Sequence, residues 1–159
     1  KVEFKSENDS AKVAGEILSK LISLMNVEAV SSLTATGDDD QSGPMFDVEG
    51  DDAGLLIGRR GETLQALQFI TRVITNNRIE DRSIISIDVE GYNERRDQSL
   101  MSLADRVAQR VVRTGRSIEL EPMTPRERRV IHMFLAENLN VFTESSGVGN
   151  DRRIVILPT

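Results

Sequence analysis

The residues best suited to chemistry in this chain are two arginines enclosed by two glycines at positions 58–61. Arg59 and Arg60 supply positive charge, and an arginine side chain presents a planar set of donors that fits a phosphate group. Gly58 and Gly61 allow a sharp backbone turn and leave room for a ligand to approach the main chain. The pattern favours binding of a phosphodiester backbone. A tight turn between two helices would explain the same four residues.

Two predicted helices position this loop. A helical pattern that includes Leu64, Leu67 and Thr71 predicts a helix from about Glu62 to position 77. Its first N–H groups would point at the loop, where they would favour an anion. A short helix over 53–57 is expected to lead into the loop. The glycines and arginines should therefore stand at a helix-to-helix turn.

The order of the predicted elements around the loop reduces the number of possible folds. Apolar spacing predicts a helix over 11–25 and strands over 27–36, 44–49 and 83–89. The resulting order, α-β-β-α-α-β, resembles the bacterial (type II) KH domain, whose GXXG loop clamps single-stranded nucleic acid. The resemblance implies an α+β KH domain over 1–91. It also implies RNA contacts by the loop and by an apolar floor beside it: Ile57, Gly58, Arg59, Arg60, Gly61 and Leu64.

A long helix is predicted over 92–114 and is expected, as residues 92–116, to link this domain to a second one. At about 100° per residue, four of its arginines fall on one flank: Arg95, Arg106, Arg110 and Arg113. Two interpretations stay open. The flank could be a basic binding stripe, or it could be an ordinary solvated helix face with intrahelical pairs.

A capping box marks the start of another helix. Thr124 is the expected N-cap, Pro125 the first helical residue, and Glu127 the glutamate that closes the box. Arg128 and His132 lie four residues apart and therefore on the same side of this helix. Strands over 141–144 and 152–157 follow, joined by a Gly-rich turn. A single histidine beside an apolar stripe would also suit a purely structural role.

The segment 117–159 resembles the R-three-H domain, a small module that binds single-stranded nucleic acid and is named for its Arg-x-x-x-His spacing. The resemblance implies nucleic-acid contacts by five residues: Arg126, Arg128, Arg129, His132 and Arg153. A KH domain followed by an R-three-H domain resembles the bacterial Jag/KhpB family of cytoplasmic RNA-binding proteins, whose members carry a further N-terminal domain that we do not find in this sequence.

That resemblance implies a function and partners. We expect a cytoplasmic protein that binds single-stranded RNA, or single-stranded DNA at the R-three-H domain, and acts in post-transcriptional or cell-envelope regulation. A protein partner of the KH or membrane-insertase type is also implied. The alternative is a protein-interaction adaptor with little nucleic-acid binding, in which the acidic segment 1–52 docks a basic partner.

Composition and charge limit the kinds of function and of site that the chain can have. The net charge of −6 is unevenly distributed, because residues 1–52 hold 4 lysines and 12 acids whereas residues 53–159 hold 16 arginines and 14 acids. The basic half is thus the half that carries the predicted phosphate contacts. The sequence has no cysteine and one histidine, and no apolar run approaches the length of a membrane span.

No catalytic constellation is evident in the sequence. We find no nucleophile with a matching base, no paired carboxylates at catalytic spacing and no nucleotide-binding fingerprint. We therefore expect no enzymatic activity, no cofactor and no metal. The run 38–40 of three aspartates could bind a divalent cation through oxygen ligands, but a solvated hairpin tip explains it more simply.

Overall fold

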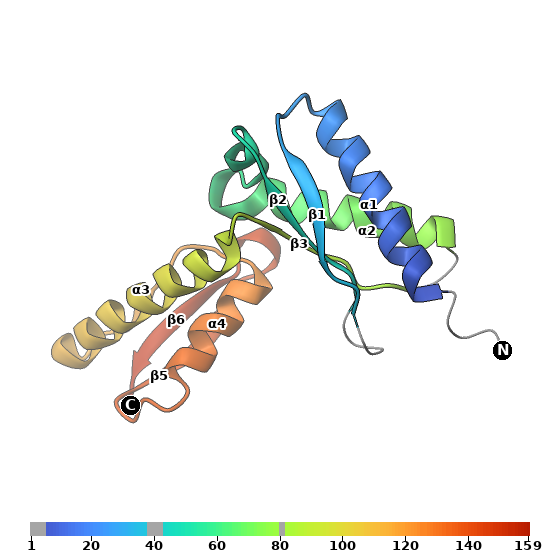
Figure 1. Ribbon diagram of the computed structural model, residues 1–159. Coiled ribbons are helices and arrows are strands. Elements are labelled where there is room, and N and C mark those ends of the chain that lie inside the picture. Colours follow the sequence, from blue (N-terminus) through green and yellow to red (C-terminus); the bar gives the residue numbers. More distant parts are fainter. Residues whose placement is uncertain (1–5, 38–42, 80–81) are drawn as a thin grey trace. The chain divides into compact units, whose positions relative to one another are not determined.

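The computed structural model describes residues 6–37, 43–79 and 82–159, which form two compact units, 1–93 and 94–159 (Figure 1). Each unit contains helices and a three-stranded sheet, so the predicted α+β class is confirmed. The three aspartates at 38–40 lie outside the described residues. Within the described ranges, no helix combines the length and the apolar character needed to cross a bilayer.

The first unit has the predicted element order. It contains α1 (Ser6–Leu24), β1 (Val30–Ala35), β2 (Met45–Glu49), the 3₁₀ turns η1 (Ala53–Leu56) and η2 (Arg59–Gly61), α2 (Glu62–Ile79) and β3 (Ser86–Val89). The short helix expected before the glycine loop is the 3₁₀ turn η1. The sheet order is β1-β2-β3, with β1 antiparallel and β3 parallel to the central β2.

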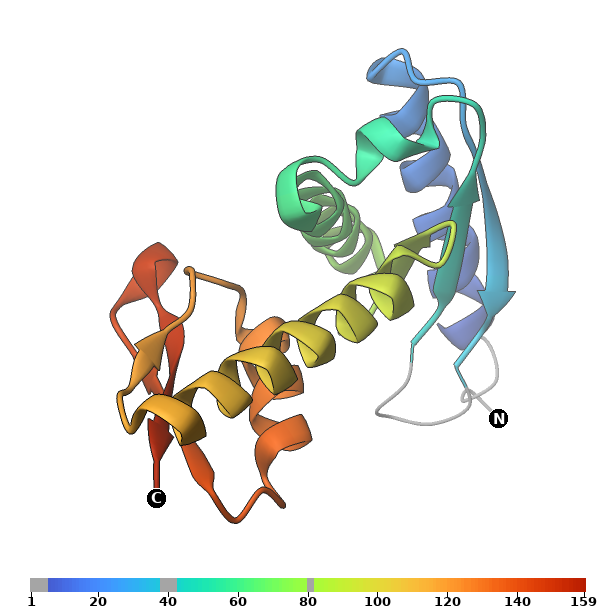
Figure 2. The ribbon, with the colours of Figure 1, turned by 90° about the vertical axis from the view of Figure 1, so that its left-hand side faces the viewer.

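Alternation along the strands explains how the first unit packs. Phe46 and Val48 of β2 and Ile87 and Val89 of β3 are buried, whereas the residues between them are not. A two-residue period places these four side chains on one sheet face. Both α1 and α2 lie on that side of the sheet (Figure 2). The outer edge of β3 is covered by α2, because the Gln68 side chain accepts the Ile87 N–H at 2.9 Å.

The second unit contains α3 (Tyr92–Thr114) from Glu94 onward, β4 (Ile118–Glu119), α4 (Pro125–Leu135), β5 (Val141–Ser146), η3 (Gly149–Asp151) and β6 (Arg153–Pro158). The strands form an antiparallel sheet in the order β4-β6-β5. The predicted capping box is confirmed. Thr124 Oγ1 accepts the Glu127 N–H, and Glu127 Oε2 accepts the Thr124 N–H at 2.9 Å. These bonds fix where α4 begins.

The helix α3 is a structural part of the second unit. Its buried residues are Leu100, Ala104, Ala108 and Val111, and they share one core with α4 and the sheet. The expected division assigned 92–116 to a connection and began the second domain at 117. The structural division falls between 93 and 94 instead. Two of these buried residues, Ala104 and Ala108, are small, so the sequence gives little sign that this helix face is buried in the second unit.

Candidate nucleic-acid interface

The predicted glycine loop joins η1 to α2 through a strained backbone. Gly58 has φ 69° and ψ −169°, and Gly61 has φ 82°. Between them, Arg60 adopts φ 54° and ψ 27°, a left-handed conformation in which arginine is uncommon. The loop therefore holds a non-glycine residue in a conformation that is unfavourable by about 1–2 kcal/mol for an L-residue.

Both glycines are required by the local packing. A Cβ atom at Gly58 would lie 2.0 Å from Thr63 Oγ1 and 3.0 Å from Thr63 N. A Cβ atom at Gly61 would lie 2.9 Å from a ring carbon of Tyr92. The two glycines thus let the loop fold back against the first turn of α2 and against Tyr92.

The N-terminus of α2 differs from the expectation that its N–H groups are open to an anion. The Ile57 carbonyl accepts the N–H groups of Thr63 at 3.1 Å and Leu64 at 3.2 Å, and the Glu62 N–H bonds to the Arg59 carbonyl. The loop folds back over the helix end and occupies these donors itself. Any attraction for phosphate must therefore come mainly from the arginine side chains and the loop backbone.

The predicted loop residues divide by exposure. Arg59 and Arg60 are exposed at the turn, and Arg59 has no side-chain hydrogen bond or ion pair within the described ranges. Ile57 is half-buried. Leu64 is only 4% exposed and belongs to the core, so the expected apolar floor does not extend to it. Leu64 instead anchors α2, the helix that follows the two arginines, because it belongs to the buried face of that helix.

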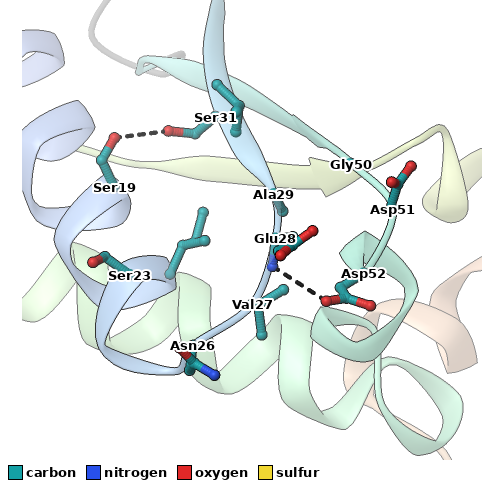
Figure 3. Close-up of a pocket in the computed structure, with 12 residues that line it drawn as sticks. Ser19, Ser23, Asn26, Val27, Glu28, Ala29, Ser31, Gly50, Asp51 and Asp52 are labelled. Carbon is teal, nitrogen blue, oxygen red and sulfur yellow. Dashed lines mark hydrogen bonds between the residues drawn. The ribbon is translucent and has the colours of Figure 1, made fainter.

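A pocket on the same unit has the wrong charge for a phosphate. It lies between the end of α1, the segment leading into β1, and residues 50–52, which precede η1 (Figure 3). Its ionisable lining residues are Glu28, Asp51 and Asp52, and Asp52 Oδ2 accepts the Glu28 N–H at 3.4 Å. Neither arginine nor lysine lines it. Like-charge repulsion would oppose a nucleic-acid backbone there.

Each member of the predicted pair on α4, Arg128 and His132, has one hydrogen-bond partner within the second unit. The Arg128 guanidinium donates to the Met123 carbonyl at 2.8 Å, which fixes its stem while leaving other donors of the fork. His132 is exposed, and its Nδ1 lies 2.6 Å from Thr143 Oγ1 of β5, so its Nε2 is the ring nitrogen that remains for a ligand.

The neighbouring arginines of α4 differ in how much charge they can offer. Arg126 forms a two-bond ion pair with Asp97, at 2.7 and 2.6 Å, which compensates its charge. Arg129 is exposed and has no such partner within the described part of the chain. Of the predicted cations on this helix, Arg128 and Arg129 are the better placed to meet an anion.

Alternation of side chains separates Arg153, the first residue of β6, from Arg152, the extended residue that precedes it. Ile154 and Ile156 are buried against the helices, so Arg152 shares their side of the chain and Arg153 faces the other way. Arg153 pairs with Glu119 at 3.5 Å. Arg152 Nε donates to Ser145 Oγ at 3.0 Å, and the Arg152 carbonyl accepts the Met123 N–H, next to the Arg128 contact. Arg152 is not among the residues expected from the sequence, although counting back by two from the buried isoleucines would have indicated it.

Comparison with known proteins agrees with this arrangement. Residues 12–90 match the model of the KhpA/KhpB KH domain, and residues 98–158 match the R-three-H domain. The chain belongs to the KhpB family. The second match includes most of α3, in line with the place of that helix in the core of the second unit.

Several curated relatives, each named RNA-binding protein KhpB, are similar to the chain. That of Clostridium symbiosum is 43% identical over 69% of this chain and 49% of its own length. That of Bacillus subtilis is 38% identical over 70% of this chain and 54% of its length. That of Streptococcus pneumoniae is 30% identical over 93% of this chain and 45% of its length. The chain spans about half the length of the KhpB relatives it matches.

Proposed function

We propose that this KhpB-family chain is a non-enzymatic protein that binds single-stranded RNA through two sites. The first is the loop of the KH domain, with Gly58, Arg59, Arg60 and Gly61 against the phosphate backbone and Ile57 beside them. The second is the α4 site of the R-three-H domain, with Arg128, Arg129 and His132, to which we add Arg152. Single-stranded DNA is a second ligand of that site.

The observation that carries this proposal is the left-handed Arg60 between two positive-φ glycines. Residues held in unfavourable backbone conformations are concentrated at functional sites, where the strain serves a purpose other than stability. Arg59 and Arg60 are both exposed, so neither side chain contributes a buried apolar contact to the core. The loop thus places two adjacent charges at an exposed turn and holds one of them, Arg60, in a conformation that glycine would adopt more easily, which supports a role in ligand binding.

The test is a charge-reversal variant of the loop. We expect Arg59→Asp/Arg60→Asp to weaken binding of a fluorescently labelled single-stranded RNA at least about tenfold at moderate salt, because attraction is replaced by repulsion. The matched control is Lys12→Asp/Lys20→Asp, which makes the same charge change at two exposed positions of α1. Thermal unfolding should be similar for both variants. Equal affinities of the two variants would refute the loop as a site.

The α4 site needs a separate test, because each unit is compact by itself. We expect Arg128→Gln/His132→Ala to weaken RNA binding several-fold, whereas Glu137→Gln, an exposed change near the end of the same helix, should not. A normal affinity of the double variant would leave Arg128 and His132 with a structural role only.

In the cell, we propose a cytoplasmic post-transcriptional regulator, with cell-envelope genes among its targets. The support is the name RNA-binding protein given to the relatives and the presence of both domains. Crosslinking the intact protein to RNA in growing cells, followed by sequencing of the bound RNA, tests this proposal. Recovery no greater than that of the Arg59→Asp/Arg60→Asp variant would contradict it.

A second candidate function is that of a protein-interaction adaptor, and α2 favours it. Its buried face includes Thr71 and Thr75, which bond back to helix carbonyls at 2.8 and 2.7 Å. Its outward face carries Phe69, Ile70 and Val73, and Phe69 is 56% exposed. An apolar stripe on the solvent side of a helix is typical of a docking surface. A KH-type or membrane-insertase-type partner would cover it.

This alternative predicts an outcome that RNA binding does not. Phe69→Gln/Val73→Gln should abolish capture of such a partner while leaving RNA affinity unchanged. The reverse pattern, with partner capture intact and RNA affinity lost, would assign α2 to nucleic-acid binding and contradict the adaptor hypothesis.

A further inference from the structure

The outward face of α3 carries a row of arginines that neither proposed site uses. Arg106, Arg110 and Arg113 are exposed, and the buried residues of the helix lie on its opposite side. At about 100° per residue, the three arginines fall within about 60° of one another. We call these three residues the α3 stripe. It faces away from the core that α3 shares with α4 and the sheet.

Among the described residues, five arginines of the second unit have side-chain partners that the stripe arginines lack. Within the described part of the chain, no stripe residue has a side-chain hydrogen bond or an ion pair. The five other arginines are engaged, by Glu127, Asp97, the Met123 carbonyl, Ser145 and Glu119, namely Arg96, Arg126, Arg128, Arg152 and Arg153. The charge of the stripe is therefore left uncompensated by side chains in a protein whose net charge is −6.

Helix stability accounts for only one stripe residue, Arg113, which stands in the last turn of α3, where a positive charge interacts favourably with the helix dipole. Arg106 and Arg110 are four residues apart and Arg110 and Arg113 three apart, so neighbouring like charges repel by about 0.2–0.5 kcal/mol per pair. No acid stands three or four residues from any of them along the helix. Asp105 lies on the flank, where its carboxylate accepts a bond from Gln109 at 2.8 Å. A solvated face stabilised by intrahelical pairs therefore does not explain these three residues, because no acid is spaced to pair with them.

We propose that the α3 stripe is a further RNA-binding site, which holds the phosphodiester backbone without reading the base sequence. Arginine is the residue best suited to phosphate, and a rigid helix presents the three forks along about 10 Å at 1.5 Å per residue. That length is enough for two or three consecutive phosphates of one strand. Gln109, Ser99 and Ser102 border the stripe and add only neutral polar groups. The inference rests on the proposed function.

The stripe faces away from α4, so it contacts a different part of the bound strand than Arg128 and His132 do. It should therefore matter more for long RNA than for short RNA, because a second contact on one strand gains from a high effective concentration. It should matter equally for strands of different base composition, since phosphate contacts carry no sequence information.

The experiment measures how RNA affinity depends on salt. Single-stranded RNAs of about 10 and about 30 nucleotides are titrated with the full chain between about 50 and 200 mM salt. Each lost phosphate contact reduces the slope of log Kobs against log salt by about 0.7 for single strands, so Arg106→Gln/Arg110→Gln/Arg113→Gln should reduce it by about 2 on the long RNA. The matched control is Lys12→Gln/Lys20→Gln/Arg78→Gln, with the same change in net charge at exposed positions of α1 and α2.

Two further variants separate the loss of phosphate contacts at the stripe from a folding defect and from the effect of the glycine loop. Replacing the three stripe arginines by lysine keeps the charge and should restore most of the slope, which a folding defect would not allow. The Arg59→Asp/Arg60→Asp variant should lose affinity for both RNA lengths. The inference is overturned if the glutamine variant keeps the wild-type slope on long RNA, or if the control reduces the slope equally. If the wild-type chain binds neither RNA, the proposed function fails together with the inference.

Discussion

Two ion pairs of nearly equal length join α3 to α4, and their burial predicts very different contributions to stability. Arg96 Nε lies 2.7 Å from Glu127 Oε1, and Arg126 lies 2.6 Å from Asp97. The side chains of the first pair are 26% and 6% exposed, and those of the second are 51% and 23% exposed. Glu127 also closes the capping box of α4 through its other carboxylate oxygen. We predict that Glu127→Ala destabilises the second unit strongly and that Arg126→Ala does not.

The magnitude follows from what each change leaves behind. Glu127→Ala leaves the partly buried guanidinium of Arg96 without its carboxylate partner and removes one of the two hydrogen bonds of the capping box. Breaking a buried pair on one side is destabilising by about 3–5 kcal/mol, and the partial exposure of Arg96 places this case near the lower end. Loss of the Glu127 bond to the Thr124 N–H adds about 0.5–1 kcal/mol. An expected total of about 3–4 kcal/mol compares with about 1 kcal/mol or less for the exposed Arg126 pair.

The assay is calorimetry of the full chain, with hydrogen exchange of α4 peptides to assign the affected unit. For a unit of this size, 3 kcal/mol corresponds to a fall in Tm of roughly 12–24 °C. Glu137→Ala, which removes an exposed carboxylate near the end of α4, is the matched control and should change little. The reasoning is refuted if Glu127→Ala and Arg126→Ala lower the stability of the unit by similar amounts.

Three further predictions concern single residues of the proposed sites. Gly58→Ala should destabilise the first unit by at least about 1–3 kcal/mol in chemical unfolding, because the backbone conformation is unfavourable for alanine and the new Cβ would clash with Thr63. The control Gly54→Ala should be close to neutral, since nothing lies within 4 Å of a Cβ there. Arg60→Gly should stabilise the same unit by up to about 1 kcal/mol by relieving the left-handed conformation, and yet weaken RNA binding; a simultaneous loss of stability would contradict the strain argument. Arg152→Gln should weaken RNA binding more than Arg153→Gln, as measured by fluorescence anisotropy, and an opposite ranking would show that the outer sheet face holds the ligand.

Much of the fold follows from local sequence signals. The α4 helix begins at the predicted residue because Thr124, Pro125 and Glu127 supply a complete capping box within four residues. The strands β2 and β3 were recognisable because a half-buried strand alternates apolar and polar residues. The glycine loop was predicted from four adjacent residues, since its glycines act on the backbone at their own positions. In each of these cases, the residues that determine the local structure are close to one another in the sequence.

The sequence by itself therefore determined the order of the elements, the start of α4 and the exposed arginines of the glycine loop. Only the tertiary structure decided that α3 belongs to the second core, because Ala104 and Ala108 become informative once a partner packs against them. Long-range packing also placed Leu64 in the core, set Asp97 against Arg126, and left the α3 stripe without a side-chain partner within the described residues. The physical reason is that periodicity gives the direction of a side chain on its own element, whereas burial and charge compensation depend on what other elements bring to that side.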